Sequence, residues 1–266
     1  MNRFRCCAFL SSFFQGDRLF HHAGIWLGVA LLMVVICFID GAYVAQHFSY
    51  GQWVSSFIMI VYYVWMYRNA SPRLRAMMKY GVVVGIVGEV LFSLVVGMYE
   101  YRLANVPVYV PPGHSILYGA VYYFVREPVV LKHQRLVNGV MVSLSLAYVG
   151  YWMIAHQDVF GTLCAVVFVA LVVKHKESRT FFLAMFLFVA YLEQVGTRFQ
   201  AWYWHSTLLG RIPWIPSGNP PSGISVFYFL FDAGVLFAYL TRRKAVRARY
   251  RRLQRTRSFM GCRSPV

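Results

Sequence analysis

Acidic residues are scarce in this chain, which carries nine Asp and Glu against 26 Lys and Arg in 266 residues. Charged residues make up only 13% of the chain and hydrophobic residues 59%, a composition that excludes an ordinary soluble domain of this size. A net charge of +17 would suggest nucleic-acid binding in a soluble protein. Because basic residues collect in the cytoplasmic loops of membrane proteins, we instead expect a membrane protein with no nucleic-acid partner.

Several motifs are also missing from the sequence. The five cysteines show no C-x-x-C spacing, so we expect neither a disulfide framework nor a zinc site. The chain has no P-loop, no Rossmann glycine fingerprint and no G-x-S-x-G elbow. No Lys lies inside an apolar segment, which argues against a chromophore bound as a Schiff base. Any catalysis would therefore take place within or beside the bilayer.

Apolar runs close to the roughly 20 residues that cross a bilayer recur along the chain. They predict an all-α membrane protein with about eight transmembrane helices. The segment 114–125 is the shortest of them, and it is alternatively read as a re-entrant helix. The predicted spans are 23–45, 52–67, 80–98, 114–125, 136–155, 159–173, 180–200 and 223–241.

The basic residues give this layout an orientation. With both termini in the cytoplasm, all but three of the 26 Lys and Arg fall on the cytoplasmic side. The exceptions are Arg102, Arg198 and Arg211. We therefore expect a multi-pass protein of the bacterial inner membrane. Membrane lipids are its expected partners, and the basic tail is expected to attract anionic head groups.

The two halves of the chain share an ordered set of features. In each half a Glu inside an apolar segment precedes an aromatic-x-aromatic pair by about ten residues, and a proline-rich run follows. The pattern predicts a parallel internal repeat of two four-helix halves. The expected divisions are an interfacial arm at 1–22, a first half at 23–135, a second half at 136–241 and a basic tail at 242–266.

The acids inside the apolar segments are the candidate catalytic residues. A carboxyl group in a membrane helix is energetically costly, so it usually faces the bundle interior and serves a function. Glu89, Glu193 and Asp232 fit this description, and His114 follows the first Pro-Pro-Gly step. These groups suit acid–base catalysis or a proton relay. The alternative is a hydrogen-bond network that only ties the helices together.

The two proline-containing loops, 99–113 and 205–223, are expected to form a rigid outer cap over the site. Ser222 is predicted to cap the last helix, and His114 or Ser115 the fourth. Such helix ends could bind an anionic head group. The candidate substrate-binding residues are Asn219, Ser222, Arg198, Trp202 and Trp204.

No cofactor is predicted. His47, His114, His156 and His205 fall on the expected outer side. Together with Glu89, Glu193 or Asp158 they could hold a divalent metal. Their spacing matches no metal motif, so no metal ligands are assigned.

A slightly irregular G-x-x-x-x-W-x-W run, with five residues between Gly196 and Trp202, is followed by P-S-G-N-P-P-S-G, which ends at Gly223. Together they resemble a signature of uncharacterised bacterial multi-pass membrane proteins. The resemblance covers mainly the second half of the chain. It implies a membrane location and no particular activity.

These observations support three hypotheses for function. The first is an integral membrane enzyme that modifies a lipid or isoprenoid-type substrate near the outer leaflet by carboxylate acid–base chemistry. The second is a proton-coupled transporter of a small or amphipathic solute, in which the same acids act as a relay. The third is a membrane assembly or structural protein.

Overall fold

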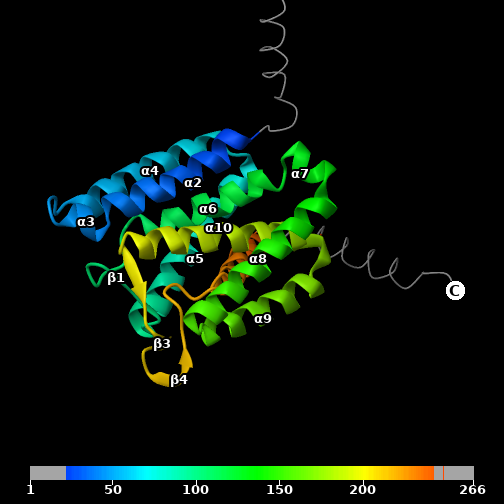
Figure 1. The fold of residues 1–266 in the computed structure, drawn as a ribbon. Coiled ribbons are helices and arrows are strands. Elements are labelled where there is room, and N and C mark those ends of the chain that lie inside the picture. The colour runs from blue at the N-terminus through cyan, green and yellow to red at the C-terminus, as the bar shows by residue number, and fades with distance from the viewer. Residues whose placement is uncertain (1–21, 243–247, 249–266) are drawn as a thin grey trace, which may run out of the picture.

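The computed structural model describes residues 22–242 and residue 248 (Figure 1). It is 73% helical, and it adds short β-strands that the all-α prediction did not include. The arm at 1–22 and the tail at 242–266 lie almost entirely outside the described residues. Within residues 22–242, four helical segments are long and apolar enough to cross a membrane, which suggests a membrane protein. They are Ala23–Ala45, Pro72–Val95, Gln134–His156 and Lys176–Arg198.

The first half of the described chain forms four long helices, and the longest connection between them, 96–109, contains a short strand. Helix α2 packs against α4 and α6, and α5 packs against α6 (Figure 1). Their bounds are α2 Ala23–Ile39, α3 Ala42–Ala45, α4 Gly51–Asn69, α5 Pro72–Glu89, η2 Val90–Val95 and α6 Val110–Phe124.

The second half of the described chain is also mostly helical. Helix α10 packs against α8, α2 and α6, while α11 packs against α5 and also contacts α9. Helices of the two halves are therefore in direct contact. The bounds are α7 Pro128–Lys132, α8 Gln134–His156, α9 Val159–Lys174, η3 Lys176–Ser178, α10 Arg179–Arg198 and α11 Val226–Arg242.

Helix α6 begins earlier than the sequence predicted. Tyr109 occupies its N-cap position and Pro111 and Pro112 lie in its first turn, where proline is tolerated because the first N–H groups have no helical partner. The expectation that His114 or Ser115 caps this helix is therefore wrong. The helix has 15 residues, or about 22 Å, and most of its middle is buried.

The last helix begins later than predicted, at Val226. Ser222, which the sequence placed at its N-cap, lies in a turn four residues before it. Its side-chain oxygen is buried without a hydrogen-bond partner. The prediction that Ser222 caps this helix is wrong, because the buried loop before the helix is held by another residue, Asp158.

Asp158 is fully buried and organises this loop from the start of α9. Its carboxylate accepts backbone N–H groups from Gly161 at 2.9 Å, Gly218 at 2.8 Å and Ser222 at 2.6 Å. The first of these caps α9. The other two fasten the proline-containing loop, 205–223, to the helix bundle.

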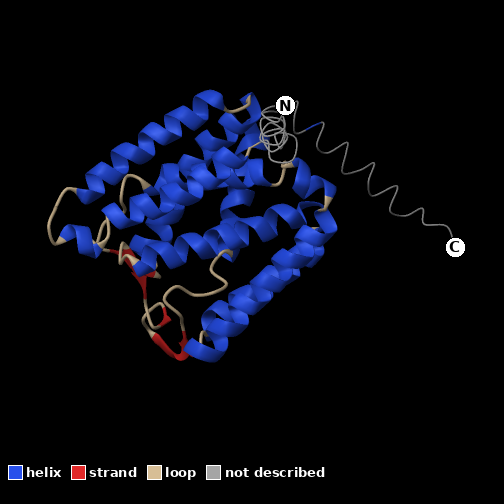
Figure 2. Ribbon diagram, turned by 45° about the horizontal axis from the view of Figure 1, so that its top comes forward, coloured by secondary structure: helices blue, strands red, loops and turns tan. Residues whose placement is uncertain are grey.

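Two pairs of short strands lie at one end of the bundle (Figure 2). Strand β1, Tyr99–Tyr101, pairs antiparallel with β2, Trp202–Trp204, so that Tyr99 faces Trp204 and Tyr101 faces Trp202. Strand β3, Thr207–Leu208, pairs with β4, Ile212–Pro216. The first pair joins segments about a hundred residues apart, and it connects the two halves of the chain.

Large apolar side chains cover the outside of several helices. Phe57 on α4 is 70% exposed, Val95 on η2 69% and Ile154 on α8 85%. A soluble monomer rarely exposes continuous apolar surface of this kind. In a bilayer the same side chains would contact lipid.

We expect Asp158→Asn to destabilise the protein by about 2 to 4 kcal/mol, because a buried carboxylate that accepts three N–H groups is replaced by a neutral amide. The measurement is the unfolding midpoint in detergent, with Glu177→Gln at an exposed position as the control. Equal midpoints for Asp158→Asn and the wild-type protein would contradict the assigned role.

Candidate functional site

A cavity of about 320 Å³ lies within the helix bundle. Its walls come from α2, α4, α5, η2, α6, α10 and α11 and from the two strands β1 and β2. Most of the lining side chains are apolar, and Glu89, His114 and Glu193 are the titratable groups in it other than tyrosine and cysteine. Its volume falls in the range of small-molecule sites.

Glu89 is buried and makes three side-chain hydrogen bonds. Its Oε2 accepts hydrogen bonds from the hydroxyls of Tyr99 and Tyr101, each at 2.7 Å. Its Oε1 lies 2.7 Å from Nε2 of His114. Both carboxyl oxygens are thus occupied.

Glu193 is also buried, and its donors come from the other strand. Its Oε2 accepts hydrogen bonds from the indole N–H groups of Trp202 at 2.8 Å and Trp204 at 3.0 Å. Among the described residues Oε1 accepts no hydrogen bond. One oxygen of this carboxyl group is therefore available to a ligand in the cavity.

The pairing of β1 with β2 brings the two carboxyl clusters together. The rings of Tyr99 and Trp204 lie 4.6 Å apart between centroids, and those of Tyr101 and Trp202 lie 6.1 Å apart. Two routes thus connect Glu89 to Glu193, one through Tyr99 and Trp204 and the other through Tyr101 and Trp202. Each route consists of two hydrogen bonds and one ring contact. The two aromatic-x-aromatic motifs form a single layer between the acids.

The tyrosines of this layer are held in their neutral form. Burial raises the pKa of Tyr99 and Tyr101 well above the ordinary value, and the neighbouring charge of Glu89 adds to the effect. A phenol that stays protonated can act only as a fixed donor to Glu89 near neutral pH.

The backbone next to Glu89 is irregular. The α-helix ends at this residue and continues as the π-helix η2, Val90–Val95. Gly97 follows with a φ of +66°, which glycine adopts without strain. Short π-helical segments occur often at functional sites. Here the π-helix connects α5 to β1. The side chains of β1 then contact Glu89 at the end of α5.

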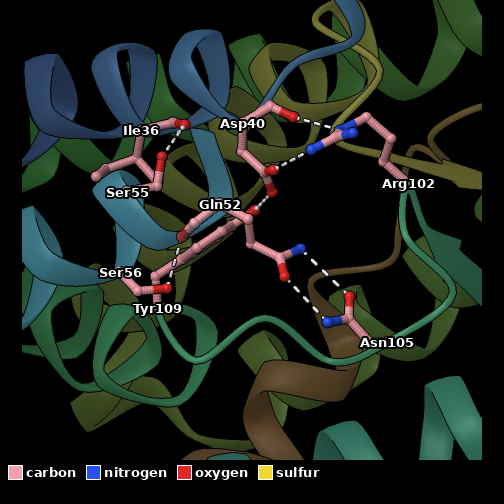
Figure 3. Close-up of polar contacts among 8 residues, drawn as sticks. All are labelled: Ile36, Asp40, Gln52, Ser55, Ser56, Arg102, Asn105 and Tyr109. Carbon is pink, nitrogen blue, oxygen red and sulfur yellow. Dashed lines mark hydrogen bonds and ion pairs between the residues drawn. The ribbon is translucent and has the colours of Figure 1, made fainter. Parts of the chain in front are cut away.

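A second polar cluster supports the loop between β1 and α6 (Figure 3). Buried Asp40 pairs with Arg102 at 2.8 Å and accepts the hydroxyl of Tyr109 at 2.8 Å. Gln52 and Asn105 exchange two amide hydrogen bonds, at 3.2 and 3.0 Å. This cluster fixes the loop 99–113, just as Asp158 fixes the loop 205–223.

The structure brings together five of the predicted site residues. Glu89, Glu193, His114, Trp202 and Trp204 all line the cavity.

The remaining predicted residues lie elsewhere. Arg198 is exposed at the end of α10, and Asn219 accepts the N–H of Trp204 at 2.9 Å from outside the cavity lining. Ser222 lies beside Asp158. Asp232 is on α11, but its side chain lies outside the described residues. Among the described residues Glu193 is bound by the indoles of Trp202 and Trp204, and it forms no ion pair with Arg198.

The histidines are dispersed. Only His114 contacts Glu89, while His205 lies 3.6 Å from Glu100. The rings of His47 and His156 contact Tyr43 and Trp152. Within the described part of the chain, no group of three or more His, Cys, Asp or Glu is positioned to hold a metal.

Sequence reasoning did not select Tyr99 or Tyr101 as site residues. The signal for both was present, because each lies in the aromatic-x-aromatic pair that follows Glu89. The sequence did not predict that Asp40 and Asp158 hold the loops, because ends of helices normally reach solvent, whereas both acids are buried.

The chain matches no protein-family model, no curated protein and no solved structure. The chemistry of the cavity is therefore the basis for assigning a function.

We expect Gly196→Ala to destabilise the protein by about 1 to 3 kcal/mol, because a Cβ at this position would overlap the indole ring of Trp202. The ring must move, and its N–H would then leave Glu193. The measurements are the unfolding midpoint and the tryptophan fluorescence spectrum. Gly139→Ala is the matched control, since its Cβ meets nothing within 4 Å. Equal behaviour of both variants would contradict the close packing.

The raised pKa of Tyr101 predicts a stability contribution that is present below about pH 10 and lost above it, since the unfolded chain releases this proton first. Unfolding midpoints from pH 8 to pH 11 should therefore fall more steeply for the wild-type protein than for Tyr101→Phe. Tyr43→Phe, at an exposed position, is the control. Parallel curves for wild type and Tyr101→Phe would rule out the linkage.

Proposed function

We propose that this protein is an integral membrane enzyme that modifies a lipid or isoprenoid-type substrate by acid–base catalysis at Glu89 and Glu193. The observation that carries the proposal is the pair of carboxyl groups in an otherwise apolar cavity. Buried acids in a cavity that a hydrophobic molecule can enter are typical of a catalytic site.

The hydrogen bonds suggest different roles for the two acids. Both oxygens of Glu89 receive donors, with His114 on one of them, which suits a carboxylate that accepts a proton. Glu193 receives both of its donors on Oε2, so Oε1 is free to carry a proton toward the cavity. We assign Glu193 as the general acid and Glu89, supported by His114, as the general base.

The cavity reaches the outer surface of the bundle between α5 and α11. Val87 on α5, Leu91 on η2 and Leu230 on α11 line the cavity and are 62%, 44% and 64% exposed. This surface is apolar and would face lipid in a bilayer. A hydrophobic substrate could therefore enter sideways from the membrane without crossing water.

The proposal includes eight membrane crossings, with the site at the outer side of the bacterial inner membrane. The segments 68–79, 126–135 and 174–179, which contain turns and the adjoining helix ends, carry ten Lys and Arg. Strands β1 and β2 lie at the opposite end of the bundle from α7 (Figure 1). Positive charge on the cytoplasmic side would place the strands and the acids toward the outer leaflet.

A parallel repeat of the two halves is also part of the proposal. Glu89 is bound by residues 10 and 12 positions later, and Glu193 by residues 9 and 11 positions later. The contacts of α5 with α11 and of α6 with α10 are equivalent under such a repeat. The matched geometry supports a duplicated unit whose aromatic-x-aromatic strands meet at the axis.

The proton-coupled transporter remains the alternative. It would use the same two acids as a relay for a polar or amphipathic solute. The apolar cavity wall and its opening on the lipid-facing surface favour the enzyme, because a polar solute needs polar partners along its path.

We expect Glu89→Gln and Glu193→Gln each to lower turnover of the membrane substrate by about 100-fold to 10,000-fold, since each removes a proton-transfer group. The measurement is conversion of total membrane lipid by purified protein in nanodiscs, with products identified by mass spectrometry. Glu177→Gln, at an exposed position, should retain wild-type turnover.

Two results would contradict the assignment as an enzyme. One is unchanged lipid conversion by both cavity variants. The other is pH-gradient-driven uptake of a solute into proteoliposomes that Glu89→Gln abolishes, which would establish the transporter.

A further inference from the structure

Aromatic rings dominate the wall of the cavity close to the two acids. Trp202 and Trp204 contact Glu193, and Tyr99 and Tyr101 contact Glu89. Phe92 and Phe227 line the cavity from η2 and α11 with their ring centroids 5.1 Å apart. The faces of such rings carry negative potential and attract cations.

The described residues that line the cavity include no Lys or Arg. Arg102 is the nearest candidate by sequence, but it pairs with Asp40 in the cluster that supports the loop. A phosphate or diphosphate head group would therefore meet two carboxyl groups and no arginine or lysine. Recognition of such groups normally uses bidentate or clustered basic side chains.

The other polar groups of the cavity are suited to proton transfer rather than to binding an anion. Glu193 has one oxygen without a donor, and Nδ1 of His114 is buried without a hydrogen-bond partner. His114 packs against the rings of Tyr228 and Phe231, with centroid separations of 5.2 and 4.9 Å. These groups can supply and receive protons inside an apolar, aromatic chamber.

We propose that the substrate is a neutral polyunsaturated hydrocarbon of the isoprenoid type, and that the reaction moves a double bond or closes a ring through a carbocation. This inference rests on the proposed function and specifies its substrate class. It excludes isoprenoid diphosphates and phospholipid head groups from the cavity.

The step balances without an oxidant or a second reactant. The carboxyl O–H of Glu193 breaks, and its proton joins one carbon of a C=C bond through the π electron pair. The other carbon becomes cationic, and a second C=C bond of the same chain can add to it. Glu89 then removes a proton from the carbon next to the cation, and the electron pair of the broken C–H bond forms the new double bond. The product is an isomer of the substrate, and proton return from Glu89 to Glu193 resets the site.

The aromatic layer would stabilise the cation between these two proton transfers. A cation over an indole or phenyl face gains about 0.5 to 2 kcal/mol at protein sites. The rings are held in place by the strand pairing and by their bonds to the acids. The same side chains that orient the carboxyl groups would thus protect the charged intermediate from water.

The substrate class is tested with two probes that share one hydrocarbon chain, farnesene and farnesyl diphosphate. Full-length protein in nanodiscs is titrated with each, and binding is followed by quenching of tryptophan fluorescence. We expect farnesene to bind at least tenfold more tightly. Tighter binding of the diphosphate, or no binding of farnesene, would overturn the inference.

The proton step is tested by incubating farnesene with the protein in D₂O and measuring deuterium in the recovered hydrocarbon. Incorporation by wild type should be lost in Glu193→Gln, while farnesene still binds. Phe92→Leu should reduce incorporation by about tenfold with binding retained, because the cation loses a ring face. Phe160→Leu on α9, outside the cavity lining, is the matched control.

The outcomes separate this inference from the proposed function. Glu193-dependent conversion of farnesyl diphosphate, without deuterium in farnesene, would overturn the hydrocarbon substrate and leave an acid–base enzyme. Equal deuterium incorporation by wild type and Glu193→Gln would overturn the proton step. Lipid conversion that depends on neither acid would overturn both proposals.

Discussion

A carboxyl group inside an apolar helix bundle must find hydrogen-bond donors, and this constraint explains much of the architecture. Helices α5 and α10 each carry one such group. Neither helix can supply the donors itself, because its backbone N–H groups are already used. The chain meets the requirement by leaving each helix and returning as a short strand, Tyr99–Tyr101 or Trp202–Trp204, whose side chains donate to the acid.

The strands in turn need support, since an isolated pair of three-residue strands is not stable. Two other buried acids provide it from helix ends. Asp40 holds the first loop through Arg102 and Tyr109, and Asp158 holds the second through backbone N–H groups. These four buried acids therefore have two roles. Asp40 and Asp158 fix the loops, and Glu89 and Glu193 line the cavity.

Sequence patterns predicted some of this site correctly. Glu89 and Glu193 were identified because a charge in a long apolar run is energetically costly, and both line the cavity. Trp202 and Trp204 were expected as substrate contacts, whereas the structure shows them first as donors to Glu193. Arg198 was expected to bind substrate, but it is exposed at the end of α10 and does not line the cavity. An exposed position is expected for a cation that can reach water or head groups.

The sequence by itself determined that the chain is apolar and helical and that Glu89, Glu193 and Asp232 lie within its helices, because composition and run length depend only on local residue types. The tertiary structure decided which donors Glu89 and Glu193 receive and that one cavity contains both. The physical reason is that β1 and β2 lie about a hundred residues apart, and their pairing depends on how helices of both halves pack. No local pattern encodes a hydrogen bond between segments so distant in the chain.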